Sequence, residues 1–181
     1  MFLKTQLSWT VSVPASNLDS EGSNLQKAIL TRLLDDFATK KASRDIGYFL
    51  AVTTLDHIGQ GIVSQYSGDI QFPVDFTCVT FKMFVGEILH GVIHKVMKNG
   101  VFLRCGPAEK VYLSRQKMAG YEFVPGETPC FKKNVEDEGG KSRIENGTTL
   151  RFSVIAEKYD ETEKDFKAVV GLEGDCLGPI S

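Results

Sequence analysis

The sequence is short of the features that mark membrane, secreted and zinc-binding proteins. No stretch approaches the roughly 20 apolar residues that a membrane-spanning helix needs, and residues 1–6 lack the basic-then-apolar order of a signal peptide. The four cysteines form no C-x-x-C pair, so neither a disulfide framework nor a zinc ribbon is indicated: Cys78, Cys105, Cys130 and Cys176. We therefore expect an intracellular protein with reduced, buried thiols.

Signatures of common enzymes are also missing. The sequence has no nucleophile elbow, P-loop, dinucleotide fingerprint or Cys/His pairing in a context that supports catalysis. Asp35-Asp36 and Glu136-Asp137-Glu138 are best interpreted as solvated carboxylates on a helix flank and in a loop. His90 and His94 lie four apart in a predicted strand without a third ligand nearby, so a metal site is not indicated. We expect a binding protein that is not an enzyme and needs no metal or cofactor.

Net charge is low and unevenly distributed. The formal value of −2 at pH 7, with 42% hydrophobic and 24% charged residues, is that of an ordinary globular protein rather than one that coats nucleic acid by bulk electrostatics. Residues 82–117 carry seven Lys or Arg against Glu87 and Glu109, whereas residues 134–181 carry six basic against eleven acidic residues. Any basic surface must therefore come from the chain before residue 134.

The first 60 residues predict strands and one helix. Alternating apolar positions from Leu3 to Val13 indicate a strand that Pro14 ends. A capping box of Ser23 and Gln26 then opens a helix that ends near Thr39, with an apolar stripe at helical spacing: Leu25, Ile29, Leu33 and Phe37, with Leu30 and Leu34.

Two further strands follow the helix. Residues 48–55 are rich in β-branched and aromatic residues, and Ile62-Val63 begins another strand, so residues 56–61 predict a hairpin with a glycine-rich tip. A longer extended run from Ile70 keeps its apolar residues on one parity as far as Cys78 and then changes parity. Such a change implies a bulge or a passage between two cores, so we place a domain boundary near residue 80.

Residues 81–181 predict a small closed barrel of the oligonucleotide-binding (OB) class. Five short strands are indicated: Glu87–Val96, Gly100–Cys105, Lys110–Ser114, Leu150–Ala156 and Phe166–Gly171. The polar stretch Asn134–Thr148 between the third and fourth strands is interpreted as an exposed loop. The expected fold is an α+β unit over residues 1–80, an antiparallel sheet with one packed helix, followed by an all-β barrel.

The first three barrel strands resemble the S1 subclass of OB barrels. The glycine-bounded first strand, the Gly100-x-Phe102 second strand and the Tyr112-x-Ser114 third strand occur in the expected order. In such barrels one face of the second and third strands holds aromatic side chains on which unpaired bases stack, with cations flanking for the phosphates. One departure is Asn99, where many S1 modules carry a second aromatic residue.

This resemblance predicts an RNA-binding face. Val101 and Leu103 are expected to point inward, which leaves Phe102 and Arg104 on the outer face near Tyr112. The predicted RNA-binding residues are Lys95, Lys98, Phe102, Arg104, Tyr112 and Arg115. The alternative is that Phe102 and Tyr112 are packing residues of a barrel that binds protein.

The whole chain resembles the stalk subunit, or seventh subunit, shared by eukaryotic RNA polymerase II and the archaeal RNA polymerase. The resemblance rests on the initial Met1-Phe2, the A-V-T-T-L-D-x-I-G-x-G segment at residues 51–61, the C-terminal S1 barrel and the D-x-L-G ending at residues 175–178. In that family the N-terminal half is a tip domain whose hairpin loop docks at the base of the polymerase clamp, here Ile58, Gly59, Gln60 and Gly61. A plain hairpin turn is the alternative for that loop.

The resemblance implies a non-catalytic subunit in the nucleus. Its implied partners are a helical fourth-subunit-type protein, with which it forms a heterodimer, the largest polymerase subunits, and the emerging single-stranded transcript. Residues 13–22 and the barrel rim depart from the polymerase II pattern, which resembles the paralogues of plant RNA polymerases IV and V that act in small-RNA production and RNA-directed DNA methylation. The alternatives are a polymerase II stalk subunit and a freestanding S1 RNA-binding protein, and the low net charge disfavours the latter.

Overall fold

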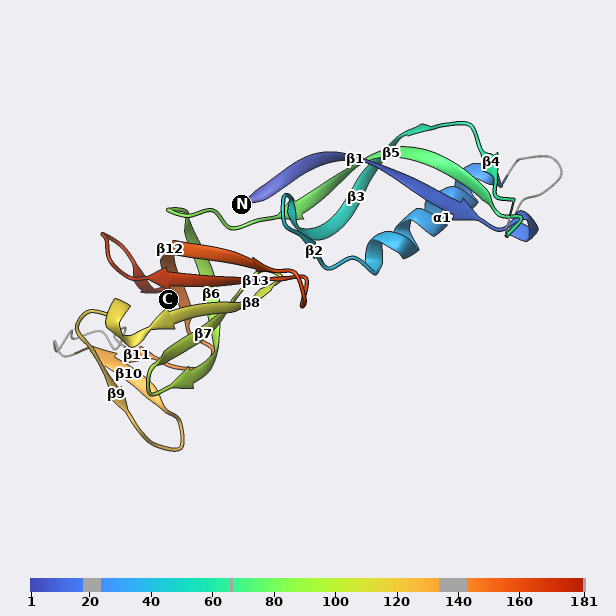
Figure 1. Cartoon of the computed structure of the whole chain (residues 1–181). Coiled ribbons are helices and arrows are strands. Elements are labelled where there is room, and N and C mark those ends of the chain that lie inside the picture. Colours follow the sequence, from blue (N-terminus) through green and yellow to red (C-terminus); the bar gives the residue numbers. More distant parts are fainter. Residues whose placement is uncertain (18–23, 66, 134–142, 181) are drawn as a thin grey trace. The chain divides into compact units, whose positions relative to one another are not determined.

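The structure is a computed structural model that describes residues 1–17, 24–65, 67–133 and 143–180. The chain divides into two compact units, one of residues 2–82 and the other of the chain from Met83 on together with Met1 (Figure 1). Within the described ranges, no helix combines the length and apolar character that a bilayer crossing requires.

The N-terminal unit is an antiparallel sheet packed against helix α1. Its strand order is β1-β5-β3-β2, and β1 pairs with β5 along their full length. The elements are β1 (Phe2–Val13), a short 3₁₀ helix (Ala15–Asn17), α1 (Leu25–Ala38), β2 (Ala42–Ser43), β3 (Gly47–Ile58), β4 (Ile62–Val63) and β5 (Ile70–Phe81). Alternate residues of β1 and β5 and one face of α1 form the core: Val11, Val13, Ile29, Leu33, Phe37, Phe72, Val74, Phe76 and Cys78. The predicted sheet with a packed helix is confirmed.

Helix α1 agrees with the prediction except in its N-cap residue and in the exposure of two leucines. Its N-cap is Asn24, whose side chain makes no capping hydrogen bond, and the predicted cap Ser23 lies outside the described residues. The helix ends at Ala38, with Thr39 as the C-cap. Leu30 and Leu34 were predicted to belong to the packed stripe but are exposed, because only one face of the helix meets the sheet.

Strand β3 places its core-facing residues at every third position. Phe49, Val52, Leu55 and Ile58 all pack against the core, and the register with β5 shifts three times between them. Each shift inserts one extra residue into β3, so the side chain three positions further on returns to the same face. These bulges were not predicted. Strand β5 itself pairs with β1 without a register shift up to Phe81, so the change of parity near residue 80 marks the passage toward Met83, which is buried in the second unit.

The predicted hairpin between β3 and β4 is wrong. Both strands pair with the same edge of β5, because the opposite edge is occupied by β1. Residues 59–61 are therefore a break between two pieces of one interrupted strand. The chain reverses between β4 and β5, where the N–H of Ser64 donates to the carbonyl oxygen of Asp69 at 2.8 Å. Pairing with the next strand but one cannot be recognised from local turn residues, which explains the error.

The second unit contains a five-stranded barrel, as predicted. Its strands are β6 (Ile88–Met97), β7 (Gly100–Cys105), β8 (Ala108–Ser114), β12 (Thr149–Asp160) and β13 (Asp165–Gly171). The order β6-β7-β8-β13-β12 closes on itself through the β12–β6 pairing. Strands β8 and β13 pair in parallel, and the other neighbours pair antiparallel. This topology is that of the OB fold.

A small sheet between β8 and β12 was not predicted. It has the strand order β11-β10-β9 and includes a buried Phe131, whose ring lies 5.4 Å from that of Phe123. The additional elements are a 3₁₀ helix (Arg115–Lys117), β9 (Tyr121–Val124), β10 (Cys130–Lys133), β11 (Arg143–Ile144) and β14 (Gly178–Ile180), which pairs with β12. Of the loop predicted at Asn134–Thr148, residues 134–142 lie outside the described residues and Arg143–Ile144 form β11.

The cysteines follow the prediction at three of four positions. Cys78, Cys105 and Cys130 are buried free thiols, whereas Cys176 is exposed. Burial raises the pKa of Cys105 to about 11, so this thiol stays protonated and unreactive at neutral pH.

Candidate nucleic-acid interface

A row of aromatic rings crosses the outer face of β6, β7 and β8. Val101 and Leu103 are fully buried, as predicted, so the alternating side chain of Phe102 faces outward. Phe102 and Tyr112 lie directly opposite each other on β7 and β8, with ring centroids 5.1 Å apart. His94 on β6 extends the row, with its ring 6.4 Å from that of Phe102. Aligned cross-strand rings of this kind form a surface on which bases can stack.

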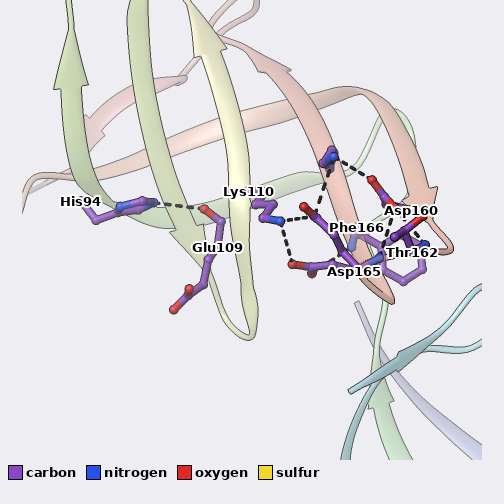
Figure 2. Close-up of polar contacts among 9 residues, drawn as sticks. His94, Glu109, Lys110, Asp160, Thr162, Asp165 and Phe166 are labelled. Atoms are coloured by element: carbon purple, nitrogen blue, oxygen red, sulfur yellow. Dashed lines mark hydrogen bonds and ion pairs between the residues drawn. The ribbon is translucent and has the colours of Figure 1, made fainter. Parts of the chain in front are cut away.

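A β-bulge brings His94 and Lys95 to the β6 end of this row. The register with β7 shifts between Ile93 and Lys95, which places Lys95 opposite Phe102. His94 is the extra residue, and its Nε2 donates to the carbonyl oxygen of Glu109 at 3.0 Å (Figure 2). From the sequence, His94 was considered only as half of a metal pair, and its place in the row was not predicted. The structure gives His90 a separate partner, Arg151, whose Nε donates to Nε2 at 3.0 Å.

The other end of the row lies at the turn between β6 and β7. The hydroxyl of Tyr112 and the backbone N–H of Arg115 both donate to the carbonyl oxygen of Asn99, at 2.8 and 2.9 Å. These bonds bring Arg115 next to the turn that carries Lys98. Both basic side chains belong to exposed residues.

The predicted cations divide into two groups according to their partners. The guanidinium of Arg104 pairs with Glu109 at 3.1 Å. Lys95, Lys98 and Arg115 have no acidic partner among the described residues. The cations without an acidic partner, which we call the uncommitted cations, therefore lie on β6, at the β6–β7 turn and just after β8, near the Phe102–Tyr112 pair.

Two further lysines on the barrel are neutralised by carboxylates of the β12–β13 turn (Figure 2). Lys110 forms an ion pair with Glu163 and lies 3.6 Å from Asp165, whose side chain is only 3% exposed. Lys167 lies 2.7 Å from Asp160 and 3.7 Å from Glu163. Lys110 belongs to the segment whose sequence charge is strongly positive, but its charge is not available to a ligand in this arrangement.

The pKa values of Asp160, Lys110 and Lys167 are shifted by the same ion pairs. The hydrogen bond from Lys167, followed by that from the backbone N–H of Glu163, lowers the pKa of Asp160 to about 2. In turn, hydrogen bonds to Glu163 and Asp160 raise the pKa values of Lys110 and Lys167 respectively. Asp160, Lys110 and Lys167 therefore remain charged near neutral pH.

Three residues of the predicted docking loop, Ile58, Gly59 and Gly61, lie close against their own sheet, whereas Gln60 is exposed. A Cβ atom on Gly59 would lie 2.5 Å from Cγ of Pro73, and one on Gly61 would lie 2.5 Å from Cε1 of Phe72. The glycines thus allow close approach of this segment to β5. Ile58 packs against the core, and the exposed apolar side chain next to this segment is Ile62, at 69% exposure.

Polar side chains of the 51–61 segment form hydrogen bonds to Thr77 of β5 and to one another. The hydroxyl of Thr53 donates to the carbonyl oxygen of Thr77 at 3.0 Å, and the carboxylate of Asp56 accepts from the hydroxyls of Thr77 and Thr54, each at 2.7 Å. The bond from Thr77, followed by that from Thr54, lowers the pKa of Asp56. These side chains hold together the irregular pairing of β3 with β5.

The fold defines a class of protein in which an α+β unit precedes an OB barrel with an aromatic outer face. No protein-family profile matches the chain. It is 52% identical over its whole length to DNA-directed RNA polymerase V subunit 7 of Arabidopsis thaliana, of which 99% is covered. It is 49% identical over 99% of its length to DNA-directed RNA polymerase IV subunit 7 of the same plant, which is covered completely.

A more distant relative belongs to polymerase II. The chain is 30% identical to DNA-directed RNA polymerase II subunit RPB7 of Glycine max, over 88% of this chain and 87% of that protein. The chain belongs to the subunit 7 family of DNA-directed RNA polymerases. This confirms the resemblance seen in the sequence and makes the protein a component of an RNA polymerase complex.

Proposed function

We propose that this chain is a non-catalytic stalk subunit of a nuclear RNA polymerase, whose barrel guides the emerging single-stranded RNA. The observation that carries the proposal is the aromatic row over β6–β8 with uncommitted cations beside it. Stacking on aromatic side chains tolerates any base, and flanking cations contact the backbone, which suits a transcript of varying sequence. The RNA-binding residues are Lys95, Lys98, Phe102, Tyr112 and Arg115, with Arg104 reduced to a secondary role by its pairing with Glu109.

The polymerase served is of the IV or V type. Identities of 52% and 49% to subunit 7 of polymerases V and IV, against 30% to the polymerase II relative, support this choice. The chain then acts in small-RNA production and RNA-directed DNA methylation.

The N-terminal unit docks on the largest polymerase subunits through residues 58–61 and the adjoining Ile62. Gln60 and Ile62 are exposed on this part of the sheet edge, and Ile62 supplies an apolar anchor, whereas Ile58 packs inward. The chain also forms a heterodimer with a helical fourth-subunit-type protein.

Affinity purification of the tagged protein from nuclei, followed by mass spectrometry, tests this function. Large polymerase subunits and a fourth-subunit-type protein are expected, and the identity of the largest subunit distinguishes polymerases II, IV and V. Recovery of ribosomal or RNA-decay proteins in their place would contradict the proposal and favour a freestanding S1 protein.

Ile62→Asp is the variant that tests docking. It is expected to lose the large subunits, whereas Leu34→Asp, which changes an exposed leucine of the same unit, retains them. Equal loss in both variants would move the docking surface away from residues 58–62. Gly59→Asp is unsuitable because its side chain would clash with Pro73 and disturb the fold itself.

A further inference from the structure

A groove of about 470 Å³ lies beside the aromatic row, between β6 and the small sheet of β9–β11. His94, Lys95 and Val96 form the wall on the β6 side. The opposite wall includes Glu127, Thr128 and Pro129 from the connection between β9 and β10, and Asn146 from the chain after β11. The groove was not predicted, because the sheet that forms its second wall was not predicted.

The chemistry of the lining fits a flat, neutral, hydrogen-bonding ligand. Val96 and Pro129 provide apolar surface, while Glu127, Thr128 and Asn146 have no hydrogen-bond partner among the described residues. Two lining cations, Lys95 and Arg143, are balanced by two lining carboxylates, Glu127 and Glu145, and Arg143 and Glu145 pair with each other at 3.8 Å. Balanced charge favours a nucleobase over a phosphate group, and the groove is large enough for one base.

Two residues connect the groove to the aromatic row. His94 lines the groove and also faces Phe102, with ring centroids 6.4 Å apart. Lys95 lines the groove and lies directly opposite Phe102 in the strand register. An RNA strand with one base stacked on Phe102 therefore brings a neighbouring nucleotide to the groove.

We propose that the groove receives one unpaired base next to the base stacked on Phe102, and that it prefers guanine to uracil. An ionised carboxylate only accepts hydrogen bonds, so Glu127 requires donors from the base. Guanine presents two adjacent donors, N1–H and the 2-amino group, to one carboxylate. Uracil presents a single N3–H between two carbonyl oxygens, which the carboxylate repels. This inference rests on the proposed RNA contact of the barrel and adds a base preference to it.

Fluorescence anisotropy with the full-length chain tests the preference, using two labelled RNA decamers. One is all uridine and the other has a single central guanosine. The guanosine-containing RNA is expected to bind about tenfold more tightly, which is the scale of one bidentate contact to a base. Glu127→Ala is expected to abolish the difference between the two RNAs, because it removes both the acceptor for guanine and the repulsion of uracil. Glu163→Ala, an equal charge change at the β12–β13 turn, retains the difference.

The outcomes separate this inference from the proposed function. Equal wild-type affinity for the two decamers, or a guanosine preference that survives Glu127→Ala, would overturn the base preference even if Phe102→Ala weakens both RNAs. Failure of the wild-type protein to bind either decamer would overturn the RNA contact itself, and the groove proposal with it.

Discussion

The hydroxyl of Tyr112 donates a 2.8 Å hydrogen bond to the carbonyl oxygen of Asn99, which holds the Tyr112 ring at the turn between β6 and β7. Asn99 stands where many S1 modules carry a further aromatic residue, and here its backbone anchors the ring that is present. A side chain held in its binding orientation loses little rotational freedom when a base stacks on it. The Phe102–Tyr112 pair is therefore arranged for stacking before RNA arrives.

Phe102→Ala is expected to weaken binding to single-stranded RNA by about 1–3 kcal/mol, the value of one base–aromatic stacking contact. Tyr112→Phe keeps the ring and removes only the bond to Asn99, so a much smaller loss is expected. Fluorescence anisotropy measures both, and circular dichroism checks that each barrel is folded. Unchanged affinity in Phe102→Ala would place the RNA elsewhere on the protein.

Lys98→Ala and Arg115→Ala are each expected to weaken RNA binding and to reduce the slope of log K against log salt by about 0.7, the value for one phosphate contact on a single strand. Lys167→Gln is the control, because Lys167 is already paired with Asp160 and Glu163. A titration of affinity against salt concentration distinguishes them. An equal effect of Lys167→Gln would show that general charge, and not position, governs the contact.

Stability at acid pH is expected to depend on Asp160. Its pKa is lowered from 3.8 to about 2 in the folded protein, so the unfolded chain takes up a proton before the folded one does. The stabilisation is complete above the unfolded value and is lost as the pH falls from about 4 toward 2. Urea unfolding of the wild type should show this loss, and Asp160→Asn should show a smaller dependence on pH in the same range. Identical pH profiles would mean that the pairing with Lys167 does not persist in solution.

Gly61→Ala is expected to lower the free energy of unfolding by about 1–3 kcal/mol, because the new Cβ would overlap the ring of Phe72. Gly126→Ala is the control, since a Cβ there meets no atom within 4 Å. Chemical denaturation compares the two variants. If Gly61→Ala kept its stability but lost the polymerase subunits in a purification, the glycine would serve docking instead of the fold.

Strands β7 and β8 could be predicted because residues 101–105 and 111–114 alternate between buried and more exposed positions. Strand β3 departs from that alternation, yet its signal is present in the sequence, where Phe49, Val52, Leu55 and Ile58 recur at every third position. A spacing of three residues matches neither the period of two of a regular strand nor the period of about 3.6 of a helix. A strand with one bulge between successive core residues keeps all four side chains on the same face.

The candidate site could be predicted only in part. Phe102 and Tyr112 follow from strand alternation and short-range motifs, but the neutralisation of Lys110 depends on Glu163, which is 53 residues away. No local pattern indicates which carboxylate a lysine will meet after the barrel closes. The groove at β6 depends in the same way on strands too short to give a periodic signal.

The three bulges of β3 also affect how the sheet meets other chains. Beyond its short pairing with β2, the outer edge of β3 is not covered by any described strand. An open edge with evenly spaced N–H and C=O groups invites pairing with a second copy and the growth of aggregates. Because β3 contains an extra residue at every third position, the N–H and C=O groups along its outer edge do not have the spacing that pairing with a regular strand requires. The same irregularity that seats the core residues thus protects the free protein from edge-to-edge association before assembly.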